Sequence, residues 1–239
     1  MLKKQFIEYH DGTTQLEGFC VYSENGSAQK PAILVAHDWS GKNEFAMKKA
    51  ERLAELGYVG FALDMFGKGK TGATVEEKAA LIQPFVQDRA ALQQRIHAAL
   101  SAVKKLSMVD TNQIAAIGFC FGGMCVLDLA RSGAKVRGVV SFHGLLQPAT
   151  EQSSSTEIAA KVLALHGYDD PMATPDHVRA FADEMTHAKA DWQLHMYGHT
   201  KHAFTNPAAN DQALGTVYKQ LADQRSWIAM QNFLTEIFS

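Results

Sequence analysis

Residues 118–123, Gly-Phe-Cys-Phe-Gly-Gly, have the composition of a nucleophile turn, in which a reactive side chain stands between glycines. An apolar run precedes this segment, and apolar residues at helical spacing follow it as far as Arg131. Between a strand and a helix, the side chain of Cys120 would project above the sheet, where the N–H groups that begin the helix stabilise a thiolate. The pattern predicts that Cys120 is a nucleophile for acyl transfer. The alternative is a glycine-rich turn around an inert, buried cysteine.

Two later loops carry the residue types that such a nucleophile requires, a base and a carboxylate that orients the base. Asp169 and Asp170 come soon after one apolar run, and His199 and His202 come soon after a later strand-like run. Because the carboxyl ends of parallel strands meet at one edge of a sheet, these loops and the turn at Cys120 are expected at the same edge. The order nucleophile, acid, base along the chain is that of α/β-hydrolases.

Strand-like and helical patterns alternate along most of the chain, which is typical of a parallel sheet with helices on both faces. A hairpin is expected first, because Asp11-Gly12 is a turn signal between two runs of strand character. We therefore expect an α/β-hydrolase-like, doubly wound and mainly parallel sheet with an antiparallel N-terminal hairpin. The expected strands lie at 6–9, 16–22, 32–36, 58–63, 114–117, 136–142, 162–165 and 192–197, and the expected helices at about 43–57, 85–106, 121–131, 176–187 and 227–237.

Composition places the chain among ordinary globular proteins and excludes several classes of partner. Its 239 residues are 46% apolar and 20% charged with a formal net charge of −2, so no broad cationic face for nucleic acid or anionic lipid is expected. Its three cysteines do not make a disulfide framework, and no apolar run suits a signal peptide or a membrane span. These features predict a single cytoplasmic domain over residues 1–239, and they leave its oligomeric state open.

These segments resemble the dienelactone hydrolase family of α/β-hydrolases, whose members carry Cys rather than Ser at the nucleophile turn. The resemblance covers nearly the whole chain. Its most specific parts are residues 118–123, residues 167–172 (Gly-Tyr-Asp-Asp-Pro-Met) and residues 197–204 (Tyr-Gly-His-Thr-Lys-His-Ala-Phe).

The resemblance implies that Cys120 is the nucleophile, Asp170 the acid and His202 the base. Asp170 is preferred to Asp169 because the family acid directly precedes the Pro-Met step. His202 is preferred to His199 because the family His precedes a small residue and Phe.

The same resemblance implies roles for residues 36–41, Ala-His-Asp-Trp-Ser-Gly. The backbone N–H groups of Phe121 and Trp39 would form the oxyanion hole. Asp38 stands where the family prototype carries a Glu that accepts the Cys proton when substrate arrives, although Asp is one methylene shorter. A carboxylate that supports a turn is the other role open to Asp38.

The expected activity is hydrolysis of small-molecule esters or lactones through a thioester of Cys120, with no metal or organic cofactor. Two alternatives stay open: a broad carboxylesterase, and a non-catalytic thiol protein for redox sensing or binding on the same scaffold. Zinc is not expected at the histidines between residues 195 and 202, because their spacing fits no helix face. A P-loop is not expected at Gly69-Lys70-Thr71, because Asp64 stands where that pattern needs Gly.

The chain departs from the family pattern at Asn206, where the prototype binds a substrate carboxylate partly through an Arg. An amide offers neutral donors only, so we expect neutral esters or lactones to be handled at least as well as free acids. Arg89 and Arg95 are expected at solvated positions, while Lys201 borders the base. The sequence assigns no substrate-binding residue, and it leaves open a lid role for the serine-rich segment 151–157.

Overall fold

The structure is a computed structural model that describes residues 1–25, 28–148 and 157–239. Its chain falls into two units, Met1–Ile117 and Gly118–Ser239, and the boundary lies within strand β5 (Val109–Phe119). The serine-rich segment 151–157 lies outside the described residues except for its last residue. The expectation of one domain over residues 1–239 stays a prediction.

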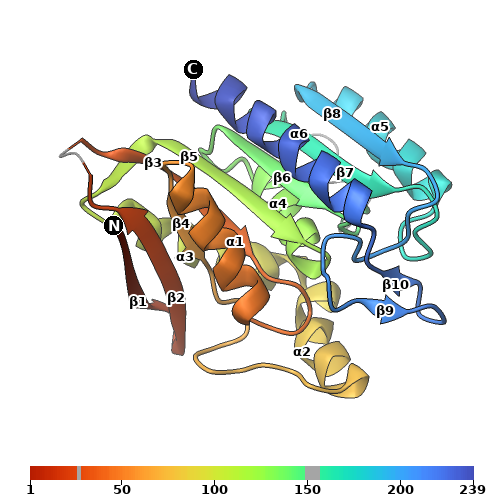
Figure 1. The fold of residues 1–239 in the computed structure, drawn as a ribbon, viewed down its shortest axis with the longest axis horizontal. Coiled ribbons are helices and arrows are strands. Elements are labelled where there is room, and N and C mark those ends of the chain that lie inside the picture. The colour runs from red at the N-terminus through yellow and green to blue at the C-terminus, as the bar shows by residue number, and fades with distance from the viewer. Residues whose placement is uncertain (26–27, 149–156) are drawn as a thin grey trace. The chain divides into compact units, whose positions relative to one another are not determined.

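The first unit begins with the expected antiparallel hairpin of β1 (Leu2–Asp11) and β2 (Thr14–Ser23). Gly12 suits its turn because a φ of 56° lies in the left-handed region. Strand β2 pairs antiparallel with β4 (Val59–Ala62), and β4 pairs parallel with β3 (Lys30–Ala36). The strand order in this unit is β1-β2-β4-β3-β5 (Figure 1).

Helix α1 (Glu44–Glu55) begins and ends where its sequence signals predict. The side chain of Asn43 accepts the N–H of Ala46 at 3.2 Å, which caps the helix. Gly57 follows the helix with a φ of 98°, a conformation that favours glycine.

The helical pattern at 85–106 was expected to form one helix, and this expectation is wrong. The structure has two helices there, α2 (Val75–Gln87) and α3 (Arg89–Lys104), with Asp88 between them. Asp88 is extended (φ −122°, ψ 94°), and its side chain accepts the N–H of Ala91 at 3.0 Å, so it caps α3. Apolar spacing did not reveal the break because Phe85, the buried residue of α2, is at helical spacing from the buried residues of α3, and the pattern therefore continues across a single capping residue.

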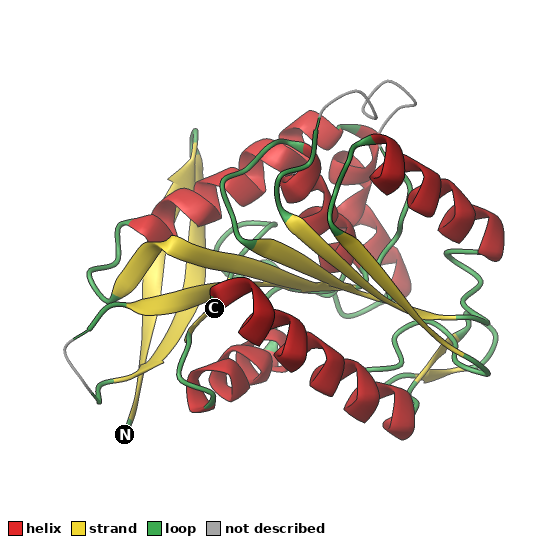
Figure 2. Ribbon diagram, turned by 90° about the horizontal axis from the view of Figure 1, so that it is seen from above, coloured by secondary structure: helices red, strands yellow, loops and turns green. Residues whose placement is uncertain are grey.

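In the second unit, strands β6 (Gly138–Phe142), β7 (Lys161–Gly167) and β8 (Trp192–Tyr197) pair in parallel in that order. Helix α6 (Gln220–Phe238) lies on one face of these strands, and α4 (Phe121–Arg131) and α5 (Pro175–His187) lie on the other (Figure 2). Helix α6 buries the apolar side chains predicted for it, Trp227, Met230, Leu234 and Ile237. The predicted fold class, a mainly parallel α/β sheet with an antiparallel N-terminal hairpin, is confirmed.

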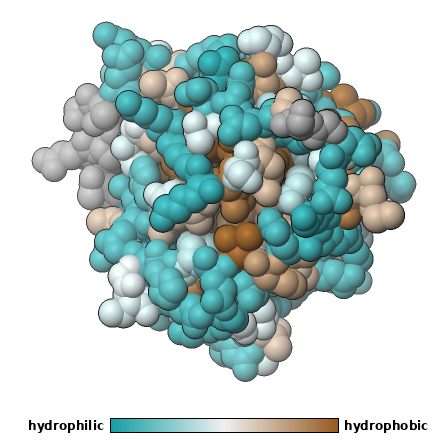
Figure 3. All heavy atoms as spheres, turned by 90° about the vertical axis from the view of Figure 1, so that its left-hand side faces the viewer, coloured by the Kyte–Doolittle hydropathy of each residue, from teal (hydrophilic) through white to brown (hydrophobic). Residues whose placement is uncertain are grey.

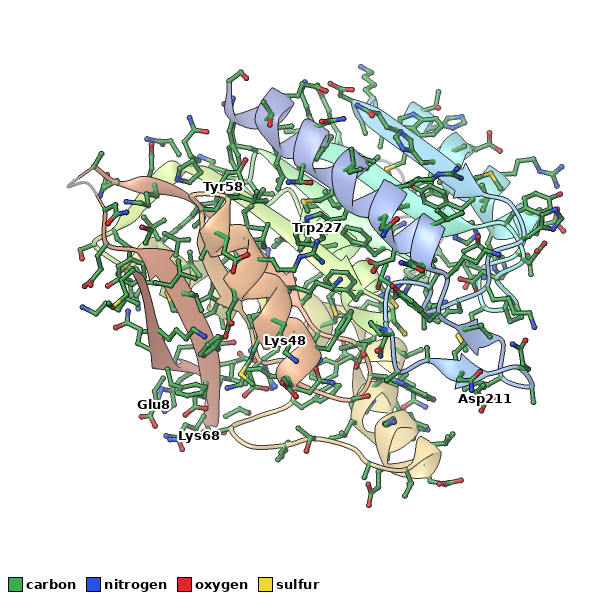
Figure 4. All side chains as sticks on the ribbon, in the orientation of Figure 1. Glu8, Lys48, Tyr58, Lys68, Asp211 and Trp227 are labelled. Carbon is green, nitrogen blue, oxygen red and sulfur yellow. The ribbon has the colours of Figure 1, made fainter. Side chains whose placement is uncertain are left out.

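The surface carries mostly polar side chains on the face that Figure 3 shows, with apolar side chains in small patches. Exposed ion pairs contribute to it, such as Glu8 with Lys68 (Figure 4) and Glu44 with Lys48 at 2.8 Å. Water screens such pairs, so they add little to stability. In the described part of the chain, no helix combines the length and the apolar character that crossing a membrane requires.

Candidate active site

Cys120 lies at the turn between β5 and α4, with a backbone conformation that few residues other than glycine adopt. Its φ is 56° and its ψ is −117°, a strained combination of the kind found at functional sites. Gly118 makes the turn possible, because a Cβ there would lie 2.0 Å from the carbonyl oxygen of Gly122. Gly123 lets the start of α4 approach the loop after β6, because its Cβ would lie 2.7 Å from Cα of Gly144. The glycines are therefore required by close backbone approaches.

Cys120 is partly exposed, whereas the other two cysteines are buried. The Cys120 N–H donates to the carbonyl of Phe142 at 3.0 Å, and the Cys120 carbonyl accepts the N–H of Gly123 at 2.9 Å, which begins α4. Phe121 is the first residue of α4, and the first N–H groups of a helix make no bonds within that helix. The thiol therefore stands at a helix N-terminus, which favours negative charge.

The acid and the base are brought together as a buried pair. Nδ1 of His202 lies 2.7 Å from Oδ2 of Asp170, and both side chains are almost wholly buried. The other oxygen of Asp170 accepts the N–H of Met172 at 2.8 Å. Because the carboxylate accepts, Nδ1 carries a proton and Nε2 is left for the chemistry. The alternative pair, His199 and Asp169, is 3.9 Å apart and exposed.

A small sheet that the sequence did not predict holds the backbone of His202. Its strands are β9 (Asn210–Asp211) and β10 (Thr216–Val217). The His202 N–H donates to the carbonyl of Gly215 at 3.0 Å, and the His202 carbonyl accepts the N–H of Val217 at 2.9 Å. Asp211, labelled in Figure 4, closes the turn between these strands by accepting the N–H of Leu214 at 2.8 Å.

The pKa of the His202 imidazole is raised to about 10. Burial is the largest influence and acts to lower it, because a charged ring loses its hydration. The charge of Cys120, and then the hydrogen bond and charge of Asp170, more than offset burial. Nε2 has no hydrogen-bond partner of good geometry among the described residues, so Cys120 acts mainly through its charge. The site therefore favours a protonated imidazole beside Cys120.

Asp38 and Trp39 lie in the first unit, in the loop after β3. Oδ1 of Asp38 accepts the N–H of Ser40 at 2.8 Å, so this carboxylate does support a turn. The Trp39 ring lies beneath the ammonium group of Lys78, 5.6 Å from the ring centroid. The proton-accepting role of Asp38 and the oxyanion role of the Trp39 N–H stay predictions.

The other two cysteines lie in buried positions. Cys125 is inside α4, as expected for a small apolar filler. Cys20 is on β2, and burial raises the pKa of its thiol to about 11, which disfavours the thiolate.

The cationic side chains that could bind a substrate carboxylate make contacts with other groups of the protein. Arg95 is held by Asp11 at 2.7 Å and by the carbonyl of Met65 at 2.7 Å, so it has a structural role rather than the expected solvated position. Nζ of Lys201 lies 3.1 Å from the side-chain oxygen of Gln212. Asn206 accepts the N–H of Ala208 at 3.0 Å through its side-chain oxygen.

Two buried histidines of this unit were missed from the sequence. His143 follows β6, and its ring contacts both the Cys120 backbone and the His202 ring. His166 is the last residue but one of β7, where burial lowers its pKa and the charges of Asp170 and His202 act on it. The position of both residues at strand ends is the signal that could have identified them, because the acid and the base were found by the same rule.

The fold and the strained turn before α4 are those of an α/β-hydrolase. A model of the dienelactone hydrolase family matches residues 16–238, and the chain belongs to this family. It is a hydrolase, and both the predicted family and the predicted enzyme class are confirmed.

Several relatives resemble the chain along most of its length. The solved structure of m3DLH is 37% identical with a TM-score of 0.94, and it covers 100% of this chain and 99% of its own. The dienelactone hydrolase-like promiscuous phosphotriesterase P91, from metagenomic libraries, is 36% identical with a TM-score of 0.95 and the same coverage. A putative carboxymethylenebutenolidase from Yersinia pestis is 24% identical over 200 residues, which cover 80% of this chain and 74% of the relative.

Proposed function

We propose that this hydrolase cleaves carboxylic esters or lactones, with Cys120 as nucleophile, His202 as base and Asp170 as the acid that orients the base. The buried 2.7 Å contact between Asp170 and His202, with the partly exposed Cys120 beside the imidazole, is the observation that carries the proposal. Putative carboxymethylenebutenolidases among the relatives favour the same substrate class.

The reaction has two acyl-transfer steps. The Cys120 sulfur attacks the ester carbonyl while its proton resides on His202, and the tetrahedral intermediate collapses to a thioester as His202 protonates the departing alcohol. His202 then takes a proton from water, which attacks the thioester and releases the acid. Asp170 keeps the imidazole in one tautomer and stabilises its charge.

The negative oxygen of each tetrahedral intermediate needs backbone donors. The N–H of Phe121, at the start of α4, is the first donor that we propose. The N–H of Trp39 is proposed as the second because of the resemblance to the family. Each donor contributes about 3 kcal/mol in comparable sites. Whether Asp38 accepts the Cys120 proton is a separate question, which an Asp38→Asn variant addresses through its effect on thiol alkylation.

Substitution of the cysteines tests the proposal. Cys120→Ala is expected to lower kcat for an aryl ester by at least about 10³-fold, and iodoacetamide is expected to abolish wild-type turnover. Cys125→Ala is the matched control, since that thiol is buried in α4, five residues beyond Cys120. If both variants hydrolyse the ester equally, Cys120 is not the nucleophile. Oxidation of Cys120 without any turnover would instead support the thiol-sensor alternative.

Phosphotriester hydrolysis is a second candidate activity, favoured by the 36% identity to the promiscuous phosphotriesterase P91. In that reaction the Cys120 sulfur attacks phosphorus, an alcohol leaves, and water releases the phosphoryl group from sulfur. Paraoxon assayed beside an aryl ester decides whether one site serves both: Cys120→Ala should abolish both activities. A range of acyl chain lengths separates a broad carboxylesterase from a lactonase.

The absence of a disulfide among the cysteines supports an assignment of compartment. Cys20, Cys120 and Cys125 are all described by the structure and none of them forms a disulfide, as a reducing environment requires. We propose a cytoplasmic location and a small-molecule substrate, with residues 1–239 acting as one domain.

A further inference from the structure

His143 has an unusual backbone position directly after β6. Its φ of 39° lies in the left-handed region, which is uncommon for residues other than glycine. Its N–H donates to the carbonyl of Leu165 on β7 at 2.8 Å, and its side chain is 2% exposed. Strain at a buried position persists where surrounding contacts over-determine it, so the contacts of the ring are informative.

The His143 imidazole connects the nucleophile turn to the loop that carries the base. The N–H of Cys120, which also donates to Phe142, is 3.2 Å from Nδ1 of His143. Nε2 of His143 lies 2.8 Å from the hydroxyl oxygen of Thr205. Thr205 is three residues beyond His202 in the same loop. One ring therefore makes polar contacts both to the backbone of Cys120 and to the loop that carries His202.

Aromatic contacts hold the same ring in place. The His143 and His202 rings meet edge to face, with centroids 5.1 Å apart and planes at 65°. Phe204 contacts His143 on another side, with centroids 5.0 Å apart and planes at 79°. Edge-to-face contacts of this kind favour one ring orientation, so His143 restricts the position of the His202 ring as well as that of its loop.

The polar contacts require one protonation state of His143. A backbone N–H can only donate, so Nδ1 accepts and carries no proton, and the single ring proton is on Nε2 and is donated to Thr205. A second proton on the His143 ring would be on Nδ1, where its N–H would point at the N–H of Cys120 and the hydrogen bond would be lost. It would also place a positively charged His143 ring against a positively charged His202 ring. The geometry therefore selects a neutral imidazole beside a His202 ring that is charged during the reaction.

We propose that His143 is a positioning residue that clamps the turn of Cys120 to the loop of His202 and so sets the geometry of their proton transfer. This inference rests on the proposed roles of Cys120 and His202. His143 itself touches neither substrate nor the transferred proton in this reading. A small misplacement of reacting groups costs up to about 10²-fold in rate, so a clamp of this kind is expected to show in kcat.

Substitutions at Thr205 test the clamp without touching either histidine. Thr205→Val has nearly the same shape but no acceptor for Nε2, whereas Thr205→Ser keeps the hydroxyl. A second pair acts on the ring: His143→Asn keeps an acceptor near Nδ1 and tolerates a positive φ, and His143→Leu removes both polar contacts. Each protein is measured for kcat and KM with an aryl ester, for the pH profile of alkylation by iodoacetamide, and for thermal unfolding.

Thr205→Val is expected to lower kcat about tenfold with KM nearly unchanged, to shift the pH profile of alkylation, and to remain folded. Thr205→Ser, which keeps the hydroxyl, is expected to retain the wild-type kcat and the wild-type pH profile of alkylation. His143→Leu should lose more activity than His143→Asn. Cys120 and Asp170 raise the pKa of His202, and the charge of His202 acts on His166; all three residues are kept in these variants. The Thr205 pair also keeps His143, the other titratable ring in contact with His202.

Wild-type kcat and a wild-type alkylation profile in both Thr205→Val and His143→Asn would overturn the clamp. A lower melting temperature with an unchanged profile would also overturn it, because that result shows a structural role alone. Cys120→Ala is assayed in parallel. If that variant still hydrolyses the ester, the proposed function is wrong, while the alkylation profile of Cys120 in the Thr205 variants still decides whether the clamp acts on the thiol.

Discussion

The imidazole of His202 donates to Asp170 at 2.7 Å within the protein interior, while His199, only three residues earlier, lies 3.9 Å from Asp169 with its side chain 98% exposed. The pair Asp170–His202 is therefore buried and in close contact, whereas the pair Asp169–His199, from the same two loops, is exposed and further apart. A buried pair is preorganised and shielded from water, and an exposed pair is neither.

Asp170→Asn and His202→Ala are each expected to lower kcat by about 10³- to 10⁴-fold, because the first leaves the imidazole without its orienting acceptor and the second removes the base. Steady-state hydrolysis of an aryl ester measures the loss. Asp169→Asn and His199→Ala are the matched controls and should stay within about threefold of wild type.

The double variant Asp170→Asn/His202→Ala should be little worse than either single variant, since residues that act as one unit lose their effect together. If the reductions in kcat of the two single variants instead multiply in the double variant, the two side chains act independently and the proposed triad is wrong.

The raised pKa of His202 leads to a prediction about Cys120. The charge of Cys120 is the largest influence that raises the pKa of His202 to about 10, and burial acts against it. In the wild type the ring should therefore keep its proton through neutral pH and lose it near pH 10. In Cys120→Ala the pKa should fall, because burial then faces Asp170 alone. An NMR titration of the histidine rings follows both proteins, and identical titrations would show that thiol and imidazole do not interact.

Substrate charge should matter little to this enzyme. The candidates for carboxylate recognition that the sequence offers have other partners or no charge, since Arg95 binds Asp11, Lys201 binds Gln212, and Asn206 offers no positive charge. A lost charge-assisted contact weakens recognition by about 1.5–3 kcal/mol, or roughly ten- to a hundredfold. We expect a neutral methyl ester to be hydrolysed at least as efficiently as the matching free acid of a dienelactone. A kcat/KM tens of times higher for the free acid would reveal a cation in the pocket.

A buried ion cluster should dominate the stability of the second unit. Arg131 of α4 makes two contacts of 2.7–2.8 Å with Glu184 of α5 and one of 3.1 Å with Asp128, all of them buried. Glu184→Ala removes two hydrogen bonds from a buried guanidinium whose charge Asp128 still balances, which we expect to cost about 1.5–3 kcal/mol of unfolding free energy.

Chemical denaturation measures this cost. Asp176→Ala is the control, because it breaks an exposed pair with Arg179 at the other end of α5 and should change stability little. If both variants lose the same free energy of unfolding, burial of the Arg131 cluster does not contribute to stability.

The sequence by itself determined the elements whose signals are local. Asn43 and Gly57 mark the ends of α1 because a cap and a left-handed residue act within one turn of helix. The turn at Cys120 was predictable for the same reason, since the glycines that permit it lie within three residues of it. The break between α2 and α3 was not, because one capping Asp88 leaves the apolar spacing intact.

Tertiary structure decided which of these residues meet. Neither spacing nor composition separates Asp170 from Asp169, and it is the path of the loop after β7 that buries one and exposes the other. The contact of His143 with Cys120 and Thr205 joins segments 23 and 62 residues away. Such contacts depend on how strands are ordered and how their ends align, and that is a property of the whole sheet and not of any short run of sequence.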